Sequence, residues 1–231
     1  MKIILSPSKT ANYHSTPLLT TSELRYPMQT KKLVLTIRKL SQKDLSKALN
    51  IKGDLVKQTH LQYQDFHKSN RHQAFPSYNG LVFKQLQKEL YTNTEYTYIN
   101  NHVVILDALY GIVEPSTLIA PYRLDMKAKL GFNLYQYWHV DDYFTDELII
   151  NLASTEFSAM IHKPFVTVHF MQKKGKEYIQ QATYSKMGRG LLLHYMILHK
   201  IETIEELIQF NQDGYGYDSL RSTKESIVFT R

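Results

Sequence analysis

Short apolar runs alternate with amphipathic stretches along this chain. Residues 2–5 (KIIL), 102–106 (HVVIL) and 147–154 (ELIINLAS) each have the pattern of a short buried strand, followed by polar residues and a helical pattern. The stretch 177–185 (EYIQQATYS) predicts another strand, which a turn at KMGRG connects to an apolar helix at 191–200. Strands that alternate with helices predict an α/β fold with a sheet at its centre.

Residues 41–66 predict a pair of helices joined by a short turn. Ser41 is a favourable N-cap, and Asp44 follows at the spacing of a capping box. The first helix is expected to end before Lys52 and Gly53, after which a second amphipathic helix begins. Such a turn can present its amides and the Lys52 charge to a DNA phosphate. An ordinary pair of antiparallel helices without a ligand has the same pattern.

The composition bounds the class of protein. A chain of 231 residues with 43% apolar residues can bury one sizeable core, and the sequence has no repeat or linker, which predicts a single domain over 1–231. No stretch has the pattern of a secretion signal or a membrane span, so a soluble, cytoplasmic protein without a membrane partner is expected. The absence of cysteine excludes disulfides, thiol catalysis and cysteine-ligated metals.

The charge narrows the class of partner. The chain has 28 Lys and Arg against 21 Asp and Glu, a net charge of +7 and a pI of about 9.3. Such an excess attracts polyanions, and nucleic acid, an anionic substrate and an acidic protein all fit it. A solvated basic surface without a ligand is the alternative interpretation.

Polar and cationic residues gather where the predicted strands end. In open α/β sheets, ligands bind beyond the carboxyl ends of the strands. Lys186 and Arg189 flank a glycine at the predicted strand-to-helix turn, where helix amides add to their charge. Polar loops without a ligand give the same pattern. The residues expected on this rim, as anion-binding groups, are Ser6, Lys9, Asn151, Ser154, Lys186 and Arg189.

The first rim segment also matches a catalytic motif. Ser6 and Lys9 have the S-x-x-K spacing of serine acyltransferases, in which the amine takes the hydroxyl proton. The partner motifs S-D-N and K-T-G do not occur in the sequence, so a strand-end anion site is the favoured interpretation. No H-E-x-x-H or G-x-x-x-x-G-K-[ST] motif occurs either, and neither a metal nor a cofactor is predicted.

Two stretches in the middle of the chain each allow two interpretations. Arg123 and Asp125 alternate in an extended run, so they are predicted to share one face of a strand. They then form either an ion pair or a site in which Arg123 faces a ligand. Leu134–Trp138 (LYQYW) contains the only tryptophan and is either part of the core or a platform on which bases stack.

Eight motifs follow one another in an order that resembles the YaaA family. The resemblance implies a single compact α/β domain of cantaloupe-type topology, with a positively charged cleft and a helix-hairpin-helix element. It also implies binding to double-stranded DNA and peroxide resistance through limiting free intracellular iron. No enzymatic activity comes with it. Bent or branched DNA is a shape preference that a phosphate-binding cleft allows. The motifs are SPSKT (6–10), YNGLVF (78–83), LYGIVEP (109–115), APYRLDM (120–126), LYQYW (134–138), NLAS (151–154), YSKMGRG (184–190) and DGYGYD (213–218).

The resemblance carries site positions over to this chain, with two departures. Met187 stands where many members have a lysine, and Glu114 where an arginine often precedes the proline, and both are expected to weaken the positive cleft. The hairpin has one glycine, Gly53, where strong DNA-binding hairpins have two. The positions that match the family are Ser6, Lys9, Tyr122, Arg123, Asn151, Ser154, Lys186 and Arg189, with the hairpin at 51–55.

Charge, hairpin and resemblance together favour a DNA-binding protein of the peroxide stress response, with low sequence specificity because phosphates carry no sequence information. The alternative is an enzyme that acts on a phosphorylated or nucleotide-like small molecule in a strand-end pocket, with Asp125 as the candidate base. Direct iron binding is the third hypothesis. It lacks any metal-ligand spacing.

Overall fold

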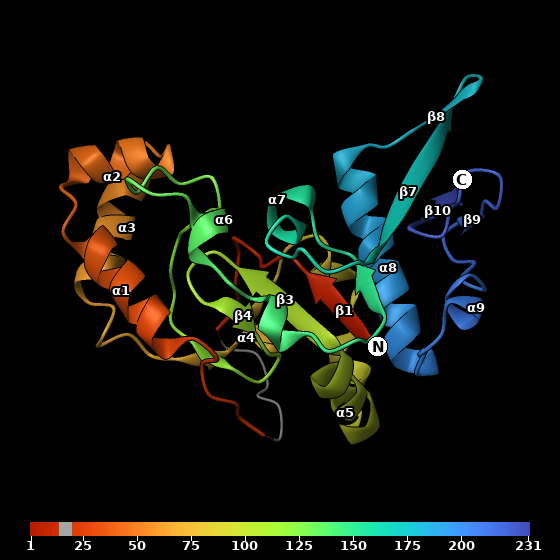
Figure 1. Ribbon diagram of the computed structural model, residues 1–231, viewed down its shortest axis with the longest axis horizontal. Coiled ribbons are helices and arrows are strands. Elements are labelled where there is room, and N and C mark those ends of the chain that lie inside the picture. Colours follow the sequence, from red (N-terminus) through yellow and green to blue (C-terminus); the bar gives the residue numbers. More distant parts are fainter. Residues whose placement is uncertain (14–19) are drawn as a thin grey trace.

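A mainly parallel sheet lies at the centre of the computed structural model, which describes residues 1–13 and 20–231 (Figure 1). The strand order is β4-β3-β1-β6-β7-β10-β9, and β8 pairs with β7. The inner pairs are parallel, whereas β4, β8 and β9 are antiparallel to their neighbours. A separate small sheet joins β2 to β5. The strands are β1 (Lys2–Leu5), β2 (His72–Gln73), β3 (Val103–Asp107), β4 (Gly111–Val113), β5 (Leu118–Ile119), β6 (Ile149–Asn151), β7 (Val166–Lys174), β8 (Glu177–Ile179), β9 (Gly216–Tyr217) and β10 (Ser226–Thr230).

Helices cover this sheet, and a further group of helices lies beyond it at one end of the molecule. Helix α5 packs on β1 and β3, and α8 packs on β7 and on α5. Helices α1 to α3 form this further group (Figure 1). The helices are α1 (Pro27–Arg38), α2 (Gln42–Leu49), α3 (Asp54–Gln64), α4 (Ala74–Ser77), α5 (Asn93–His102), α6 (Leu134–Tyr137), α7 (Thr155–Ser158), α8 (Ala182–His199) and α9 (Ile204–Leu207), with 3-10 turns η1 (Phe83–Gln85), η2 (Lys88–Leu90) and η3 (Asp141–Tyr143).

The predicted core strands are confirmed. β1 has the predicted limits, β3 is shifted by one residue, and β6 forms the centre of the apolar run at 147–154. Every residue of β3 and β6 is buried, because a parallel sheet in an α/β fold is covered on both faces. The expected single compact α/β domain is therefore the observed one.

The predicted pair of helices within 41–66 is also present, as α2 and α3. Ser41 caps α2, and its hydroxyl accepts a hydrogen bond from the Asp44 amide at 3.1 Å. Asn50 closes α2 in the left-handed conformation, and Gly53 precedes α3 with a φ of 60°. A positive φ favours glycine at that position, which is why the turn contains one.

The prediction for residues 177–190 is wrong in its boundary. Strand β8 is only three residues long, and α8 begins at Ala182, so Lys186 and Arg189 lie inside the helix and not at a strand-to-helix turn. The glycines between and after them serve close packing. A Cβ on Gly188 would lie 2.4 Å from the Phe170 ring, and one on Gly190 would lie 2.3 Å from the Val82 carbonyl oxygen.

The aromatic cluster at 134–138 belongs to the core, as the first of its two interpretations had it. Trp138 is 1% exposed, and its indole N–H donates to the Ala108 carbonyl at 3.0 Å. Gly111, with a φ of 75°, lets the indole ring approach the backbone, since a Cβ there would lie 2.7 Å from Trp138. The indole ring is therefore not available to stack on a base, and Tyr135 and Tyr137 are partly buried against the core.

Replacing Gly190 by alanine is expected to lower the free energy of unfolding by about 1–3 kcal/mol, the usual range for overpacking. The new methyl group would press on the Val82 carbonyl, and the gain in helix propensity offsets only part of this cost. Urea denaturation measures the change. Gly216→Ala is the matched control, because nothing lies within 4 Å of a Cβ at Gly216, and it should change stability by less than about 0.5 kcal/mol. Equal effects of the two substitutions would contradict the packing role of Gly190.

Candidate anion-binding groove

The carboxyl ends of β1, β3 and β6 meet at one edge of the sheet. β3 pairs with one side of β1 and β6 with the other, so the segments that follow β1 and β6 leave in opposite directions. Such a topological switch point leaves a crevice outside the strand ends. Ser6 follows β1 directly, and Ser154 is the N-cap of α7 shortly after β6.

A hydrogen bond joins the two segments at this point. The Ser6 hydroxyl accepts from the Ser154 amide at 2.9 Å, and the two hydroxyl oxygens are 3.2 Å apart. The amine of Lys9 donates instead to Asp125 Oδ2 at 2.8 Å. Ser6 therefore holds the loop after β1 against α7, and Lys9 is not directed at the Ser6 hydroxyl as an acyltransferase base would be.

A cavity of about 520 Å³ opens beyond these strand ends, and we call it the strand-end cavity. Lys186 and Arg189 of α8 line one side, and Phe157 of α7 lines another. Burial lowers the pKa of the Arg189 guanidinium, whose Nε has no hydrogen-bond partner among the residues that the structure describes. The cavity is also lined by Ser6, Lys9, Gly80 and Lys84.

A half-buried lysine holds the segment that leads into the cavity-lining loop at 79–84. The Lys88 amine donates to the carbonyls of Phe75, Pro76 and Tyr78 at 2.9, 3.2 and 2.8 Å. Burial lowers the pKa of Lys88 to about 8, whereas the three acceptors favour its charged form. Gly80 follows in this loop, where a Cβ would lie 2.6 Å from the Ser8 hydroxyl, so the loop and the segment after β1 fit closely.

A second cavity of about 550 Å³ adjoins the first, and we call it the hairpin cavity. Asn50 and Ile51, at the end of α2, form one wall. Lys9 and Glu156 line both cavities, so the two form one continuous depression, the basic groove. Other cations that line the hairpin cavity are Lys47, Arg123, Lys127 and Lys129.

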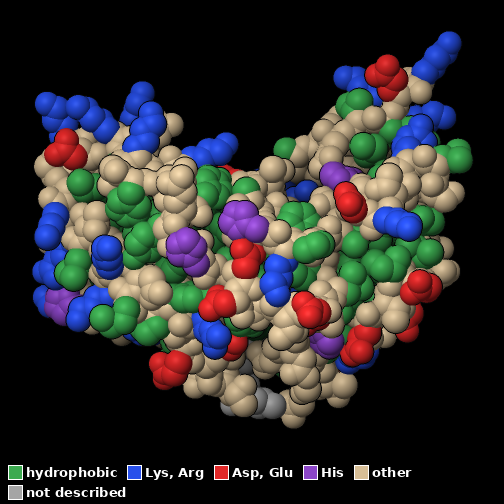
Figure 2. Space-filling view, viewed as in Figure 1, with side chains coloured by type: hydrophobic (Ala, Val, Ile, Leu, Met, Phe, Trp, Pro, Cys, Tyr) green, Lys and Arg blue, Asp and Glu red, His purple; other side chains and the backbone are tan. Residues whose placement is uncertain are grey.

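The basic groove lies on a concave face of the molecule. Figure 2 shows this face hollowed between two shoulders that both carry Lys and Arg side chains. One shoulder is formed by α2 and the other by β7 and β8 (Figure 1). The exposed lysines of these shoulders are Lys43, Lys47, Lys173, Lys174 and Lys176.

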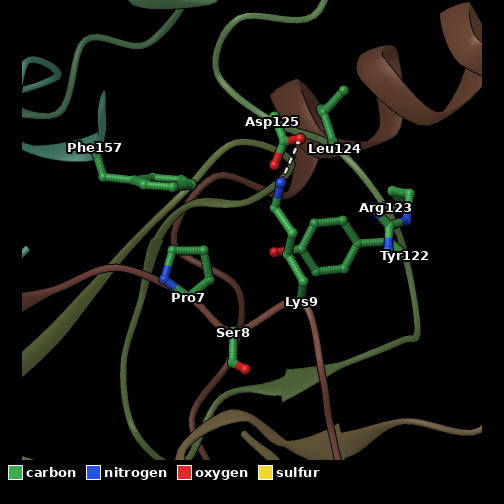
Figure 3. Close-up of a pocket in the computed structure, with 8 residues that line it drawn as sticks. All are labelled: Pro7, Ser8, Lys9, Tyr122, Arg123, Leu124, Asp125 and Phe157. Atoms are coloured by element: carbon green, nitrogen blue, oxygen red, sulfur yellow. Dashed lines mark hydrogen bonds and ion pairs between the residues drawn. The ribbon is translucent and has the colours of Figure 1, made fainter. Parts of the chain in front are cut away.

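Asp125 interrupts the positive lining of the groove. Figure 3 shows the Lys9 amine directed at the Asp125 carboxylate, with the ring of Phe157 across from them. The predicted strand is wrong, because Pro121 to Asp125 form none, but Arg123 and Asp125 both line the hairpin cavity. The ion pair of Asp125 is made by Lys9. The Arg123 backbone is fixed by the Tyr63 hydroxyl, which donates to its carbonyl at 3.0 Å.

The other predicted site residues lie outside the groove lining. Asn151 is 3% exposed, and both ends of its side-chain amide are used within the protein, by the Ala153 amide and the Thr167 hydroxyl. It is placed as a structural residue of β6. Lys52 and Gly53 are exposed on the hairpin turn, next to the residues that form the wall of the hairpin cavity.

Of the two departures from the family pattern, Glu114 lies away from the groove. It follows β4, which is antiparallel to β3, so it lies toward the opposite edge of the sheet. Its carboxylate accepts a hydrogen bond from the Tyr143 hydroxyl at 3.3 Å. The expected weakening of the positive cleft thus has no structural basis at Glu114. Met187 lies half-buried in α8, between the two cations of the strand-end cavity.

A buried carboxylate beneath the groove was not predicted from the sequence as part of the site. Asp107 ends β3, and its two oxygens accept from the amides of Leu109 and Tyr110 and from the hydroxyls of Tyr78 and Tyr122. Burial raises the pKa of Asp107, while these donors lower it. The network fixes the Tyr122 ring beside Arg123 in the groove wall. An aspartate directly after an apolar strand is the signal that points to it.

The described residues contain no group of three or more His, Asp or Glu side chains placed to hold a metal ion. Over the same residues, no helix has both the length and the apolar character needed to cross a membrane.

Comparisons with known proteins find relatives along the whole chain. The family model for the peroxide stress protein YaaA matches residues 1–220. A UPF0246 protein of Acaryochloris marina is 32% identical over 251 residues, with 100% of both chains covered. A UPF0246 protein of Fusobacterium nucleatum is 31% identical over 245 residues, covering 100% of this chain and 99% of its own length. A third, from a Marinomonas species, is 32% identical over 254 residues, with 100% and 97% covered.

Asp107→Ala is expected to lower the free energy of unfolding by about 3 kcal/mol or more, because it leaves buried amides and hydroxyls without an acceptor. Tyr122→Phe removes one donor and keeps the acceptor, so it should cost about 1 kcal/mol. Denaturant unfolding of both variants measures the difference. A cost for Asp107→Ala no larger than that for Tyr122→Phe would show that the network does not hold the groove wall.

Proposed function

Because this chain belongs to the peroxide stress protein YaaA family, we propose that it acts in the peroxide stress response by binding double-stranded DNA in the basic groove. The observation that carries the proposal is the continuity of the groove from the helical pair to the strand ends. Cations from five separate segments line it, namely Lys9, Lys47, Lys84, Arg123, Lys127, Lys129, Lys186 and Arg189.

The chemistry of this lining favours phosphate over base edges. Lysine amines and guanidinium groups neutralise phosphates and release counterions, which gives affinity without sequence preference. The turn between α2 and α3 adds Lys52 and Gly53 beside one end of the groove, where exposed backbone amides can meet a phosphate. A preference for bent or branched DNA and a location in the cytoplasm belong to the same proposal.

The proposed biological role follows the family. Protection from peroxide by limiting free iron is what the resemblance implies, and DNA is the molecule that this iron chemistry damages. The groove supplies a means of placing the protein on DNA. The residues that line it provide no carboxylate and histidine cluster for iron, so direct iron binding has no support among the described residues.

The enzyme alternative rests on the strand-end cavity alone. Its size and its lysine and arginine side chains suit a phosphorylated small molecule. Asp125, the candidate base, is already paired with the Lys9 amine. DNA binding accounts for both cavities and for the cations around them, and so it is the better-supported function.

Duplex affinity is expected to fall about 10³- to 10⁵-fold between 50 and 200 mM salt if six to ten phosphates are contacted. The double substitution Lys127→Ala/Lys129→Ala removes two cations of the hairpin cavity, so the slope of log affinity against log salt should fall by about 1.8. Fluorescence anisotropy of a labelled duplex measures both quantities.

The matched control is Lys31→Ala/Lys224→Ala, which removes the same charge at exposed positions outside the groove. It should leave the slope within about 0.3 of the wild-type value, because distant exposed charges are screened beyond about 10 Å at these salt concentrations. A flat salt response of the wild type, or equal effects of both double substitutions, would count against binding in the groove.

Asp125→Asn is expected to tighten duplex binding by about 3- to 10-fold, since it frees Lys9 and removes a negative charge from the groove. The isosteric amide keeps the shape of the side chain. The same titration at fixed salt measures the change, with Asp146→Asn, at an exposed position before β6, as a carboxylate control outside the groove lining. Weaker binding by Asp125→Asn would show that the Lys9 pair helps to form the site.

A further inference from the structure

The strand-end cavity has the position and size of a site for a specific ligand. A groove that contacts only the phosphate backbone of DNA would not need such a cavity. It lies at the topological switch point, where the segments after β1 and β6 part and Ser6 meets Ser154. Its volume of about 520 Å³ is within the range of small-molecule sites. The rest of the basic groove is the hairpin cavity, of similar volume, between α2 and the segment at 121–129.

One side of the cavity is built for a phosphate. Lys186 and Arg189 are three residues apart on α8, so both side chains point from the same face of the helix. Arg189 Nε is buried and has no partner within the described ranges, which is costly for a guanidinium unless an anion completes the site. Lys84, from η1, lines the same cavity.

The cavity also has an apolar and partly aromatic lining. Phe157 and Phe83 are 7% and 3% exposed, so their rings are fixed in the wall. Leu81 lines the same cavity and is 39% exposed, which is unusual for a large apolar side chain in a closely packed loop. Phosphate-binding groups beside an apolar aromatic wall match the two ends of a nucleotide.

The strand-end cavity adjoins the hairpin cavity, and the two form the groove in which DNA is proposed to lie. Lys9 and Glu156 are shared by the two cavities, and Phe157 also borders the small recess of Figure 3. We infer that the strand-end cavity receives a single unpaired nucleotide, with its phosphate at Lys186 and Arg189 and its base against Phe157. This inference rests in part on the proposed DNA binding, because an unpaired nucleotide of a bound strand is one source of the ligand and a free mononucleotide is the other.

An unpaired nucleotide enters such a cavity at lower cost than a paired one. Extruding a base from a duplex costs a few kcal/mol of stacking and pairing, and least where the base is already unpaired. Duplex DNA with one bulged nucleotide should therefore bind about 10-fold more tightly than the fully paired duplex, a difference of about 1.4 kcal/mol.

The test compares two labelled duplexes of the same length, one fully paired and one with a bulged 2-aminopurine. The wild type should prefer the bulged duplex and should change the 2-aminopurine emission on binding. Arg189→Gln and Phe157→Leu should reduce the preference to about 2-fold or less while the fully paired duplex still binds. Lys186→Ala, at an exposed position, repeats the test in a variant that cannot fail by misfolding of the core. Lys127→Ala/Lys129→Ala should weaken both duplexes equally.

A third arm titrates the protein with dAMP and follows binding by calorimetry. Failure of both duplexes to bind would remove the proposed function, and in that case dAMP binding that Arg189→Gln abolishes would still support the nucleotide site. Such binding without a preference for the bulge would assign the cavity to the free nucleotide. Equal binding of the two duplexes, unchanged emission and no dAMP binding would together overturn the inference.

Discussion

The two-sided pairing of β1 is the constraint on which the rest of the molecule depends. Ile3 and Ile4 are fully buried, and the strand hydrogen-bonds to β3 on one edge and to β6 on the other. Since both pairs are parallel, three strand ends come together at one edge of the sheet, and the chain must part there. Ser6 lies at this point and bonds to the cap of α7. The groove exists because the strands cannot be covered where their connections diverge.

The groove is lined by carboxylates as well as by cations, so its charge is not uniformly positive. Lys9 is held by Asp125, and Glu156 accepts a hydrogen bond from the Met126 amide at 3.2 Å. Asp125 thus fixes the segment at 121–129 against the loop after β1, and Glu156 fixes it against α7. A phosphate that enters must compete with Asp125 for Lys9, which limits affinity at that point. Among the described residues Arg189 makes no ion pair, and its buried Nε has no hydrogen-bond partner, so an anion is most favoured at the strand ends.

Much of the fold could be predicted from local pattern. The apolar runs that became β1, β3 and β6 are short and continuous, as buried parallel strands are, and Ser41 carried a capping signal that the structure confirms. The residues on the rim were predicted in part. Ser6, Lys9, Arg123, Ser154, Lys186 and Arg189 do line the groove.

The rest depended on long-range packing that a single sequence does not contain. Nothing near Lys9 in the sequence indicates that Asp125 is its partner, since the two are joined only by the fold. Asn151 has the residue type of an anion ligand, yet the neighbouring strand uses its amide through Thr167. Lys127 and Lys129 were not predicted as site residues, because neither lies within a recognisable motif. The path of the chain after Asp125 brings them to the hairpin cavity.

The error at α8 shows why glycine is ambiguous in a sequence. A Gly-Arg-Gly run fits a turn, and the turn was the natural prediction because glycine is costly inside a helix. Here the missing side chains serve contact: Gly188 lets the helix approach the Phe170 ring, and Gly190 lets it approach the Val82 carbonyl. That close approach brings the helix face with Arg189 against η1 and the strand ends. With larger residues at the two glycines the helix would stand farther from the sheet, and the guanidinium would lie in solvent instead of in the cavity.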